Sequence, residues 1–373
     1  MRIAYACPDR GVPVLGAKGA SVHVRSVTSA LQRRGHDVVL LAARIGSGNT
    51  PPDVESIVEL PDPLAEAVVE RQLRSLGADV VLERYALESG PFRRASRALG
   101  LGHVLEVNAP IVLEASRYRG RRDVGAGLER ERSTFETADA IVAVSRRLVE
   151  YVHQVSPATT VTWVPNGVDV ARFAAAQPAP LGLDAGAVVI GFVGSMKPWH
   201  GVHDLLDAFG AVLAPGRRAH LVLAGSGPES EAIARRLRAD RILVGRARHL
   251  GAVPHAQVHG LLRAFDVGVA PYLPADDFYF SPLKVLEYLA AGLPVVYPGL
   301  GDLPAMVGNA GVAYPAGDVT GLAAALAALV DDDSRRRVLA AEAIRQGRRW
   351  SWDESARALE ELLERVQTTA PVR

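Results

Sequence analysis

The chain has 373 residues, of which 49% are hydrophobic and 22% charged, as expected for a globular protein with about two domains. Its formal net charge of +1 argues against a dedicated nucleic-acid-binding protein. Its one cysteine, Cys7, excludes an internal disulfide and favours a reducing compartment. The first residues pass directly into a strand pattern, and no apolar run has the length of a membrane span. We therefore expect a cytoplasmic protein.

Strand-like and helix-like segments alternate through the first half of the chain. Strands are expected at 2–7, 37–43, 79–85, 103–108, 140–145 and 160–165. Helices are expected at 22–34, 65–76, 91–99, 128–137 and 146–153. Such alternation predicts a parallel sheet covered by helices on both faces.

A segment rich in proline and alanine, residues 174–186, predicts a linker between two domains, 1–173 and 187–351. After the linker, strands are expected at 188–195, 220–226, 241–245, 266–272 and 293–298. Helices are expected at 203–212, 229–237, 255–264, 318–329 and 334–347, and a final amphipathic helix at 352–367. We expect an α/β protein of two doubly wound, Rossmann-like domains facing a central cleft.

One stretch, Pro271 to Pro298, combines a strand end, a polar aromatic loop, a helix and a second apolar strand. Ser281 is predicted to cap the helix, with Pro282 in its first turn and Gly292 just past its end. A helix that begins after a strand in a doubly wound sheet binds anions through its free N–H groups. Lys284 adds a positive charge there, and Glu287 lies one turn further on. We therefore expect a diphosphate at the helix start and a ribose at Glu287.

The chain has only three lysines, Lys18, Lys197 and Lys284, and all precede predicted helices in loops punctuated by glycine or proline. A compact ammonium suits phosphate oxygens, so these positions favour a phosphate-binding role.

Four blocks of sequence together resemble the GT-B-fold glycosyltransferases of family 4, which are retaining and metal-independent and use nucleotide-sugar donors. The blocks are 16–36 (GAKGASVHVRSVTSALQRRGH), 164–173 (VPNGVDVARF), the pair GFVGSMKPWHG and LAGSGPE, and FYFSPLKVLEYLAAGLPVV. The variants SPLK and EVNAP resemble one subgroup of that family. The resemblance implies an acceptor-binding first domain, a nucleotide-sugar-binding second domain, a last helix that returns to the first domain, and no cofactor or metal.

The sequence departs from the family pattern at three positions. The first of two glutamates usual in the central motif is replaced by Tyr279, so Asp276 or Asp277 is expected to supply the contact to the donor sugar. An arginine and a lysine that usually hold the diphosphate read here as Ser195 and His200. Positive charge is then expected from Lys197 and Lys284.

The resemblance also assigns roles to individual residues. The catalytic group comprises Lys284 and Lys197, which would stabilise the leaving diphosphate, and Glu106 and Asn108, which would orient the acceptor. The donor and its nucleotide would be bound by Gly16, Lys18, Gly194, Ser195, His200, Gly225, Gly251, Val253, Ser281, Leu283 and Glu287. The donor sugar would meet Asp276, Asp277 and Tyr279, and the acceptor would meet His23, Glu114 and Arg117.

Structural roles compete with these assignments. Asn166-Gly167 is foremost a turn signal, with Asp169 as a helix cap, and His23 on a helix could simply pack or cap. Adjacent acids such as Asp276-Asp277 are usually solvated, so no metal site is expected. The arginine-rich run 117–122 is either a solvated surface or a contact with an anionic acceptor or membrane surface.

We expect a retaining glycosyltransferase that moves a sugar from a nucleoside diphosphate sugar to a hydroxyl on a small molecule, glycan or lipid, and no nucleic-acid partner. The alternatives are another GT-B enzyme, such as a nucleotide-sugar epimerase or a phosphorylase, and a non-catalytic sugar-nucleotide-binding subunit. An NAD-dependent dehydrogenase is disfavoured because no strand is followed by GxGxxG. The sequence leaves open the donor base, the sugar, the acceptor and the oligomeric state.

Overall fold

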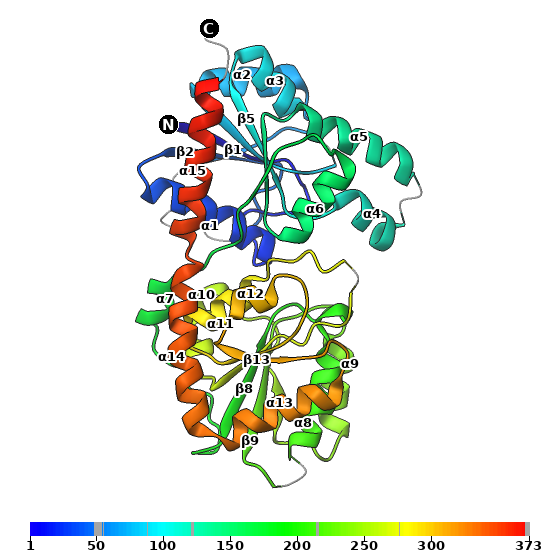
Figure 1. Cartoon of the computed structure of the whole chain (residues 1–373), viewed down its shortest axis with the longest axis vertical. Coiled ribbons are helices and arrows are strands. Elements are labelled where there is room, and N and C mark those ends of the chain that lie inside the picture. Colours follow the sequence, from blue (N-terminus) through cyan, green and yellow to red (C-terminus); the bar gives the residue numbers. More distant parts are fainter. Residues whose placement is uncertain are drawn as a thin grey trace. The chain divides into compact units, whose positions relative to one another are not determined.

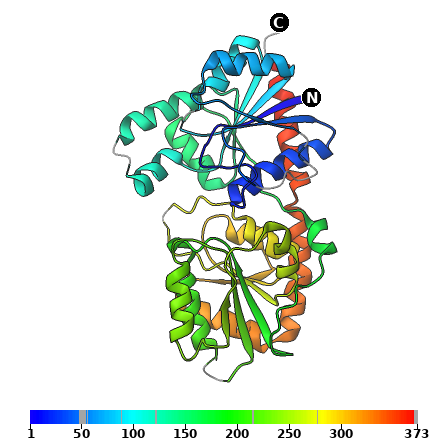
Figure 2. The same cartoon turned by 180° about the vertical axis from the view of Figure 1, so that it is seen from behind.

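The protein is described by a computed structural model that covers residues 1–47, 54, 56–87, 89–120, 123–213, 216–275 and 277–369. The chain divides into two compact units. The amino-terminal unit consists of Met1–Asn166, Tyr279–Ser281 and Trp352–Arg373, and the carboxy-terminal unit of Gly167–Phe278 and Pro282–Ser351. Each unit is an open sheet flanked by helices on both faces, as Figures 1 and 2 show. None of the helices in the described ranges is long and apolar enough to cross a membrane.

The amino-terminal sheet has seven strands in the order β3-β2-β1-β4-β5-β6-β7, and every neighbouring pair is parallel. The strands are β1 (Arg2–Cys7), β2 (Asp37–Ala42), β3 (Ser56–Glu59), β4 (Val80–Arg84), β5 (Gly102–Val107), β6 (Ala140–Ala143) and β7 (Val161–Trp163). Their near-continuous burial explains the apolar runs in the sequence, since a parallel sheet is covered on both faces. The order of the strands reverses between β1 and β4.

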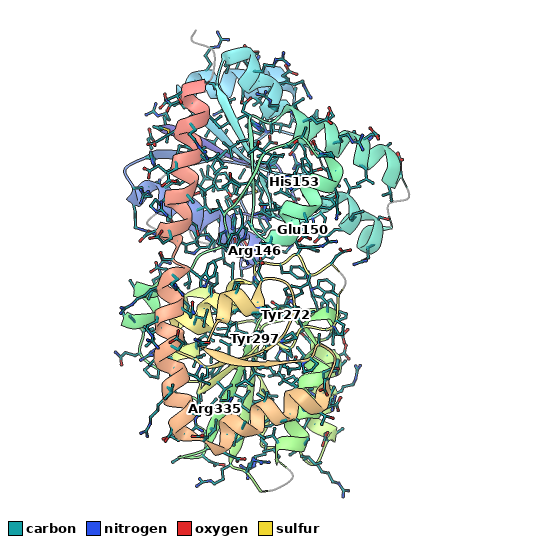
Figure 3. All side chains as sticks on the ribbon, in the orientation of Figure 1. Arg146, Glu150, His153, Tyr272, Tyr297 and Arg335 are labelled. Carbon is teal, nitrogen blue, oxygen red and sulfur yellow. The ribbon has the colours of Figure 1, made fainter. Side chains whose placement is uncertain are left out.

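The helices of the amino-terminal unit are α1 (Gly19–Arg33), α2 (Glu66–Leu76), α3 (Pro91–Leu99), α4 (Ile111–Arg119), α5 (Val124–Thr137), α6 (Arg146–Val155) and α15 (Trp352–Thr369). One apolar cluster packs α2 and α3 against β1, β2 and β4, and a second packs α5 and α6 against β5 and β6. Arg146, Glu150 and His153, labelled in Figure 3, follow one another along α6.

Helix α15 packs along α1 and against β5, although it comes more than 300 residues after α1 (Figure 1). Asp353 lies 2.9 Å from the Arg33 guanidinium, and Glu360 lies 2.7 Å from His36 Nε2. Gly102 at the start of β5 has no room for a side chain, because a Cβ there would lie 2.6 Å from Val366 of α15. The last helix therefore completes the amino-terminal unit.

The carboxy-terminal sheet has six strands in the order β10-β9-β8-β11-β12-β13, again parallel throughout. The strands are β8 (Val188–Val193), β9 (Ala219–Ala224), β10 (Ala247–His249), β11 (Val267–Val269), β12 (Val295–Pro298) and β13 (Gly311–Tyr314). Here the order reverses between β8 and β11. Both sheets are doubly wound, so the predicted fold class of two Rossmann-like α/β domains is confirmed.

The helices of this unit are α7 (Val170–Ala175), the 3₁₀ turn η1 (Pro198–His200), α8 (Val202–Leu213), α9 (Ser230–Ala239), α10 (His255–Arg263), α11 (Leu283–Ala290), α12 (Leu303–Val307), α13 (Val319–Asp331) and α14 (Asp333–Arg349). The main apolar cluster packs α8, α9 and α13 against the sheet. The proline-rich segment 174–186 lies within this unit, where Ala179 N donates to Gly260 O at 2.9 Å.

The strand predicted at 241–245 is wrong. Those residues form turns, and the strand β10 follows them at Ala247–His249. Leu243 is fully buried, but Ile242 and Val244 are each 55% exposed. The apolar run that suggested a strand is therefore a turn with one buried leucine. The structure also adds strands β3 and β13 and helices α4 and α12, which the sequence pattern did not indicate.

Candidate functional site

The strand order of the carboxy-terminal sheet reverses between β8 and β11, and the loops that follow these two strands meet at their carboxyl ends. In doubly wound sheets this topological switch point is where ligands bind. The loop after β8 contains Gly194, Ser195 and η1, and the loop after β11 runs from Ala270 to α11. We call this group of residues the switch-point site.

Helix α11 enters this site from the central motif. The prediction that Ser281 caps α11 is wrong: the cap residue is Pro282, and the Ser281 hydroxyl instead accepts a hydrogen bond from Asn166 N at 3.1 Å. The predicted role of Gly292 is confirmed, since its φ is 75° and the N–H of Leu293 donates to Tyr288 O, as at a left-handed helix end.

Tyr288 fixes α11 against the sheet. Its buried hydroxyl accepts from Val193 N at 2.9 Å and donates to Val269 O at 3.2 Å, so it joins the ends of β8 and β11. Gly268 allows the close approach, because a Cβ there would lie 2.7 Å from the Tyr288 ring. The switch point and the helix start are therefore held in one rigid arrangement.

Lys284 carries the most unusual environment of the site. Its Nζ is buried and has no hydrogen-bond partner among the residues that the structure describes. The Nζ lies 4.2 Å from the centroid of the Phe192 ring and 5.0 Å from that of Tyr272, which is labelled in Figure 3. Burial lowers the pKa of Lys284 to about 7, and the charge of Glu287 only partly opposes this. Cation–π contacts compensate only partly for the hydration that the ammonium loses on burial. Among the described residues, no acceptor contacts this ammonium.

His200 lies beside Lys284 as a neutral ring. Its Nδ1 donates to the Ser195 carbonyl oxygen, so the proton is on Nδ1 and Nε2 is a potential acceptor. Burial, together with the charge of Lys284, lowers the pKa of His200 to about 3. The histidine therefore does not replace the cation that the family pattern would place here.

Two glycines, Gly194 and Gly225, let the backbone approach the site closely. A Cβ on Gly194 would lie 2.5 Å from Lys284 Nζ, and one on Gly225 would lie 1.9 Å from Gly194 O. Gly225 N donates to Gly251 O at 2.7 Å, which brings the ends of β9 and β10 alongside the switch point. Val253, half-buried, follows Gly251 in the chain. The structure thus gathers these predicted nucleotide-binding residues at one edge of the sheet.

Glu287 lies one turn along α11 from Lys284, with 14% of its side chain exposed. Its Oε1 is 3.3 Å from Nε2 of His255, the first residue of α10. The glutamate is thus already held by a neighbouring helix.

The remaining predicted residues of this unit lie around that centre. Leu283 is the first residue of α11, and Lys197 is exposed with its Nζ 4.7 Å from the Trp199 ring centroid. Asp277 is half-buried in the loop before α11, and Asp276 lies outside the described residues.

The amino-terminal unit holds a different polar cluster, built around Glu106 on β5. Glu106 Oε1 is 2.8 Å from His23 Nε2, and Oε2 accepts from the Tyr5 hydroxyl at 2.9 Å. Burial would raise the pKa of Glu106, but the charges of His23 and Arg84 and the hydrogen bonds from His23 and Tyr5 outweigh it, and the pKa is lowered. Both carboxylate oxygens are therefore occupied by protein groups.

The same cluster continues through His23 to the central motif. His23 Nδ1 lies 2.7 Å from Asn166 Oδ1, and the edge of its ring meets Trp352 of α15 at 5.6 Å. Asn166 Nδ2 donates to Ser281 O at 2.6 Å. We call Tyr5, His23, Glu106, Asn166 and Ser281 the buried polar network.

The other predicted residues of this unit lie outside the network. Asn108 Oδ1 accepts from Arg84, and Glu114 on α4 accepts from the Tyr279 hydroxyl. Arg117 is exposed on α4. Lys18 Nζ donates to Gly11 O at 3.1 Å, and Gly16 sits in a tight turn where a Cβ would lie 2.9 Å from Pro13 O.

Across the described ranges, no group of three or more His, Cys, Asp or Glu side chains is arranged to hold a metal ion. Two lysines lie in the switch-point site: Lys284 is buried, and Lys197 in the loop after β8 is exposed.

Two doubly wound parallel sheets, each with a switch point in its strand order, are the architecture of the GT-B class of glycosyltransferases. Two family models match the chain: "Glycosyltransferase Family 4" over residues 17–172 and "Glycosyl transferases group 1" over residues 187–332. The chain belongs to family 4 of the GT-B-fold glycosyltransferases, as the sequence motifs predicted.

Curated relatives and solved structures agree with this assignment. The chain is 29% identical to a glycogen synthase of Mycobacterium tuberculosis, over 91% of this chain and 89% of that protein. It is 33% identical to a D-inositol 3-phosphate glycosyltransferase of Thermobispora bispora, over 65% of this chain and 60% of that protein. Among solved structures, sucrose-phosphate synthase from Thermosynechococcus elongatus matches with a TM-score of 0.77 and 20% identity, covering 98% of both chains. Anabaena Alr3699/HepE in complex with UDP matches with a TM-score of 0.78 and 17% identity, covering 98% of this chain and all of that one.

Several residues that shape the site were missed from the sequence. Phe192 and Tyr272 flank Lys284, Tyr288 anchors α11, and His255 holds Glu287. Phe192 lies in the predicted strand 188–195, two residues before Gly194, which was the one available signal. The others depend on tertiary contacts between elements far apart in the chain.

Proposed function

We propose that this glycosyltransferase transfers a sugar from a nucleoside diphosphate sugar to a hydroxyl acceptor, with retention of anomeric configuration and without a metal ion. The observation that carries the proposal is the buried Lys284 ammonium, which has no protein partner in the described chain and lies at the start of α11. A diphosphate would supply the missing negative charge.

The proposed chemistry needs little from the protein beyond placement and charge. As the bond between sugar and diphosphate lengthens, negative charge grows on the leaving phosphate, and Lys284 with the first N–H groups of α11 would stabilise it. In a retaining reaction on one face of the sugar, the leaving phosphate oxygen can take the proton of the acceptor hydroxyl. A protein base is then not required.

Polar side chains of the amino-terminal unit would orient the acceptor. Glu106 is buried and has both oxygens occupied, whereas Asn108 and Glu114 are half-buried and each uses one oxygen in the hydrogen bonds of the described chain. We therefore expect Asn108 and Glu114 to meet a hydroxyl. The names of the relatives, glycogen synthase and D-inositol 3-phosphate glycosyltransferase, support a carbohydrate or polyol hydroxyl as acceptor.

The first experiment measures thermal stability with UDP, GDP, dTDP, ADP and NADH, for the wild type and Lys284→Ala. A ligand at 100 times its dissociation constant adds about 2.7 kcal/mol of stability. We expect stabilisation by at least one diphosphate that Lys284→Ala loses. Stabilisation by NADH alone would favour a dehydrogenase instead.

The second experiment uses the sugar nucleotides of whichever diphosphate binds. We expect release of the diphosphate that EDTA does not inhibit, and a product whose anomeric configuration, read by NMR, matches that of the donor. Binding without turnover of any donor and acceptor pair would indicate a non-catalytic sugar-nucleotide-binding subunit. Inverted configuration or inhibition by EDTA would refute the corresponding part of the proposal.

A further inference from the structure

The carboxylate of Glu287 is held on one side only. Its Oε1 contacts His255 Nε2 at 3.3 Å, whereas Oε2 makes no hydrogen bond to any residue in the described part of the chain. Because a carboxylate can only accept hydrogen bonds, the proton of His255 must be on Nε2 in this contact. His255 therefore fixes one oxygen and leaves the other as an acceptor.

The His255 ring is itself supported from behind. It meets the edge of His259, one turn further along α10, at a centroid distance of 5.4 Å. His259 in turn packs edge-on against the buried Phe173 of α7 at 4.7 Å. Burial lowers the pKa of His259, and the charge of His255 lowers it further, so this second ring acts as a neutral support. The stack restricts the rotation of His255.

The chain places His255 next to the residues predicted to meet the nucleotide. Gly251, which bonds to Gly225, and the half-buried Val253 lead directly into α10, whose first residue is His255. On the other side, Glu287 lies one turn from Lys284, the group proposed to bind diphosphate. If Gly251 and Val253 meet the base and Lys284 meets the diphosphate, the acceptor oxygen of Glu287 has the position that a ribose requires.

We infer that His255 is a positioning residue that holds Glu287 so that its free oxygen accepts a hydrogen bond from a ribose hydroxyl of the donor nucleotide. The inference rests on the proposed function, since it assumes that a nucleoside diphosphate binds at the switch-point site. His255 and Glu287 would then together distinguish a ribose from a sugar that lacks the 2′ and 3′ hydroxyls.

The test measures dissociation constants by calorimetry for the nucleoside diphosphate that binds the wild type and for its 2′,3′-dideoxy analogue. His255→Phe keeps an aromatic ring at this position but removes the N–H that donates to Glu287. We expect it to weaken the ribonucleotide about tenfold, a typical loss for a hydrogen bond to a charged group, and to leave the dideoxy analogue within about twofold. His255→Gln, which can still donate, should recover part of the loss.

A matched control is available at the opposite edge of the same sheet. His220, at the amino end of β9, pairs with Asp184 at 3.1 Å, so His220→Phe removes a similar imidazole–carboxylate contact far from the carboxyl ends of the strands, where the switch-point site lies. We expect His220→Phe to change neither dissociation constant. A combined His255→Phe and Glu287→Gln variant should lose no more ribonucleotide affinity than Glu287→Gln alone, because the two residues act as one unit.

Two results would overturn the inference. Equal weakening of both nucleotides by His255→Phe would mean that the ring serves packing alone, and an unchanged affinity for the ribonucleotide would mean that Glu287 needs no support. Failure of the wild type to bind any nucleoside diphosphate would instead refute the proposed function, and the inference with it. Circular dichroism and the unfolding temperature identify any variant that fails to fold.

Discussion

The two units each bury a charged side chain near the carboxyl ends of their strands, but they treat that charge in opposite ways. In the amino-terminal unit, Glu106 has a protein partner on each oxygen. In the carboxy-terminal unit, Lys284 Nζ has aromatic rings around it and no acceptor among the described residues. The environment lowers the pKa of the carboxyl and thus favours its charge, whereas it lowers the pKa of the lysine and thus disfavours its charge.

This difference separates a structural role from a binding role. A buried charge with all its hydrogen bonds made can stabilise a fold, whereas a buried charge without a counter-ion costs free energy until a ligand supplies one. We therefore propose that the buried polar network organises the amino-terminal unit and that Lys284 prepares the carboxy-terminal unit for an anion. Variants at Glu106, Lys284 and Tyr279, and changes of pH, test this contrast.

The largest effect is expected from Glu106→Gln. The substitution leaves His23 without its charged partner, so the free energy of unfolding should fall by about 3–5 kcal/mol. Urea unfolding measures this change. Glu150→Gln is the control, because Glu150 is 62% exposed and its pair with Arg147 should contribute less than about 1 kcal/mol. A loss as small as that of the control would mean that the network does not organise the unit.

Lys284→Met should have two effects of opposite sign. Diphosphate affinity should fall about 100-fold or more, because the buried cation at the start of α11 is removed. The ligand-free protein should become more stable by on the order of 1–2 kcal/mol at pH 7, because a buried, unpartnered ammonium is replaced by an apolar chain of similar length. Calorimetry measures the affinity and thermal unfolding measures the stability. A ligand-free variant less stable than the wild type would contradict the claim that the unpartnered ammonium costs free energy.

The pH dependence of nucleotide binding should reveal the same lysine. With a pKa of about 7 in the free protein, Lys284 loses its proton as the pH rises, and a diphosphate favours the protonated form. Affinity should therefore fall by up to about tenfold per pH unit above pH 7, with one proton taken up on binding. Calorimetry in buffers of different ionisation enthalpy counts that proton. Lys284→Arg stays charged and should bind without this dependence.

The same shift fixes the sign of the stability change with pH. The pKa of Lys284 is lower in the folded protein than its ordinary value of 10.5, so between pH 7 and 10.5 the unfolded chain binds more protons. The free energy of unfolding contributed by this residue therefore rises with pH across that window. A slope that persists in Lys284→Met would have to come from other groups.

The smallest effect is expected from Tyr279→Phe, which removes the hydroxyl that donates to Glu114. The free energy of unfolding should fall by about 1 kcal/mol, as for one hydrogen bond. If Glu114 also meets the acceptor, the KM for the acceptor should rise while the dissociation constant of the diphosphate stays the same. A weaker diphosphate affinity would instead connect Tyr279 to the donor.

The sequence predicted the fold class, most helices and the residues at the switch point, because these follow from local patterns. Apolar runs, glycine ends and the resemblance of four motifs each act over a short stretch of chain. The prediction from sequence was wrong where one local pattern is compatible with two different structures. A lone buried leucine made 241–245 resemble a strand, and Ser281 resembled a cap although its hydroxyl is used by Asn166.

The sequence could not predict the environments that decide function. Nothing near Glu106 in the chain indicates that Tyr5 and His23 occupy its oxygens, and nothing near Lys284 indicates that Phe192 and Tyr272 surround its ammonium. These contacts join residues up to about a hundred positions apart. The roles assigned to individual residues by the family resemblance stay predictions until the variants are measured.

The return of α15 to the amino-terminal unit has a consequence for synthesis. Most domains fold in order as the ribosome releases them. Here β5, α1 and the network residue His23 all contact a helix that begins at Trp352, so the first unit to be translated is the last to be completed. The nascent amino-terminal half must stay soluble with the α15-facing side of its sheet uncovered while the whole carboxy-terminal unit is made.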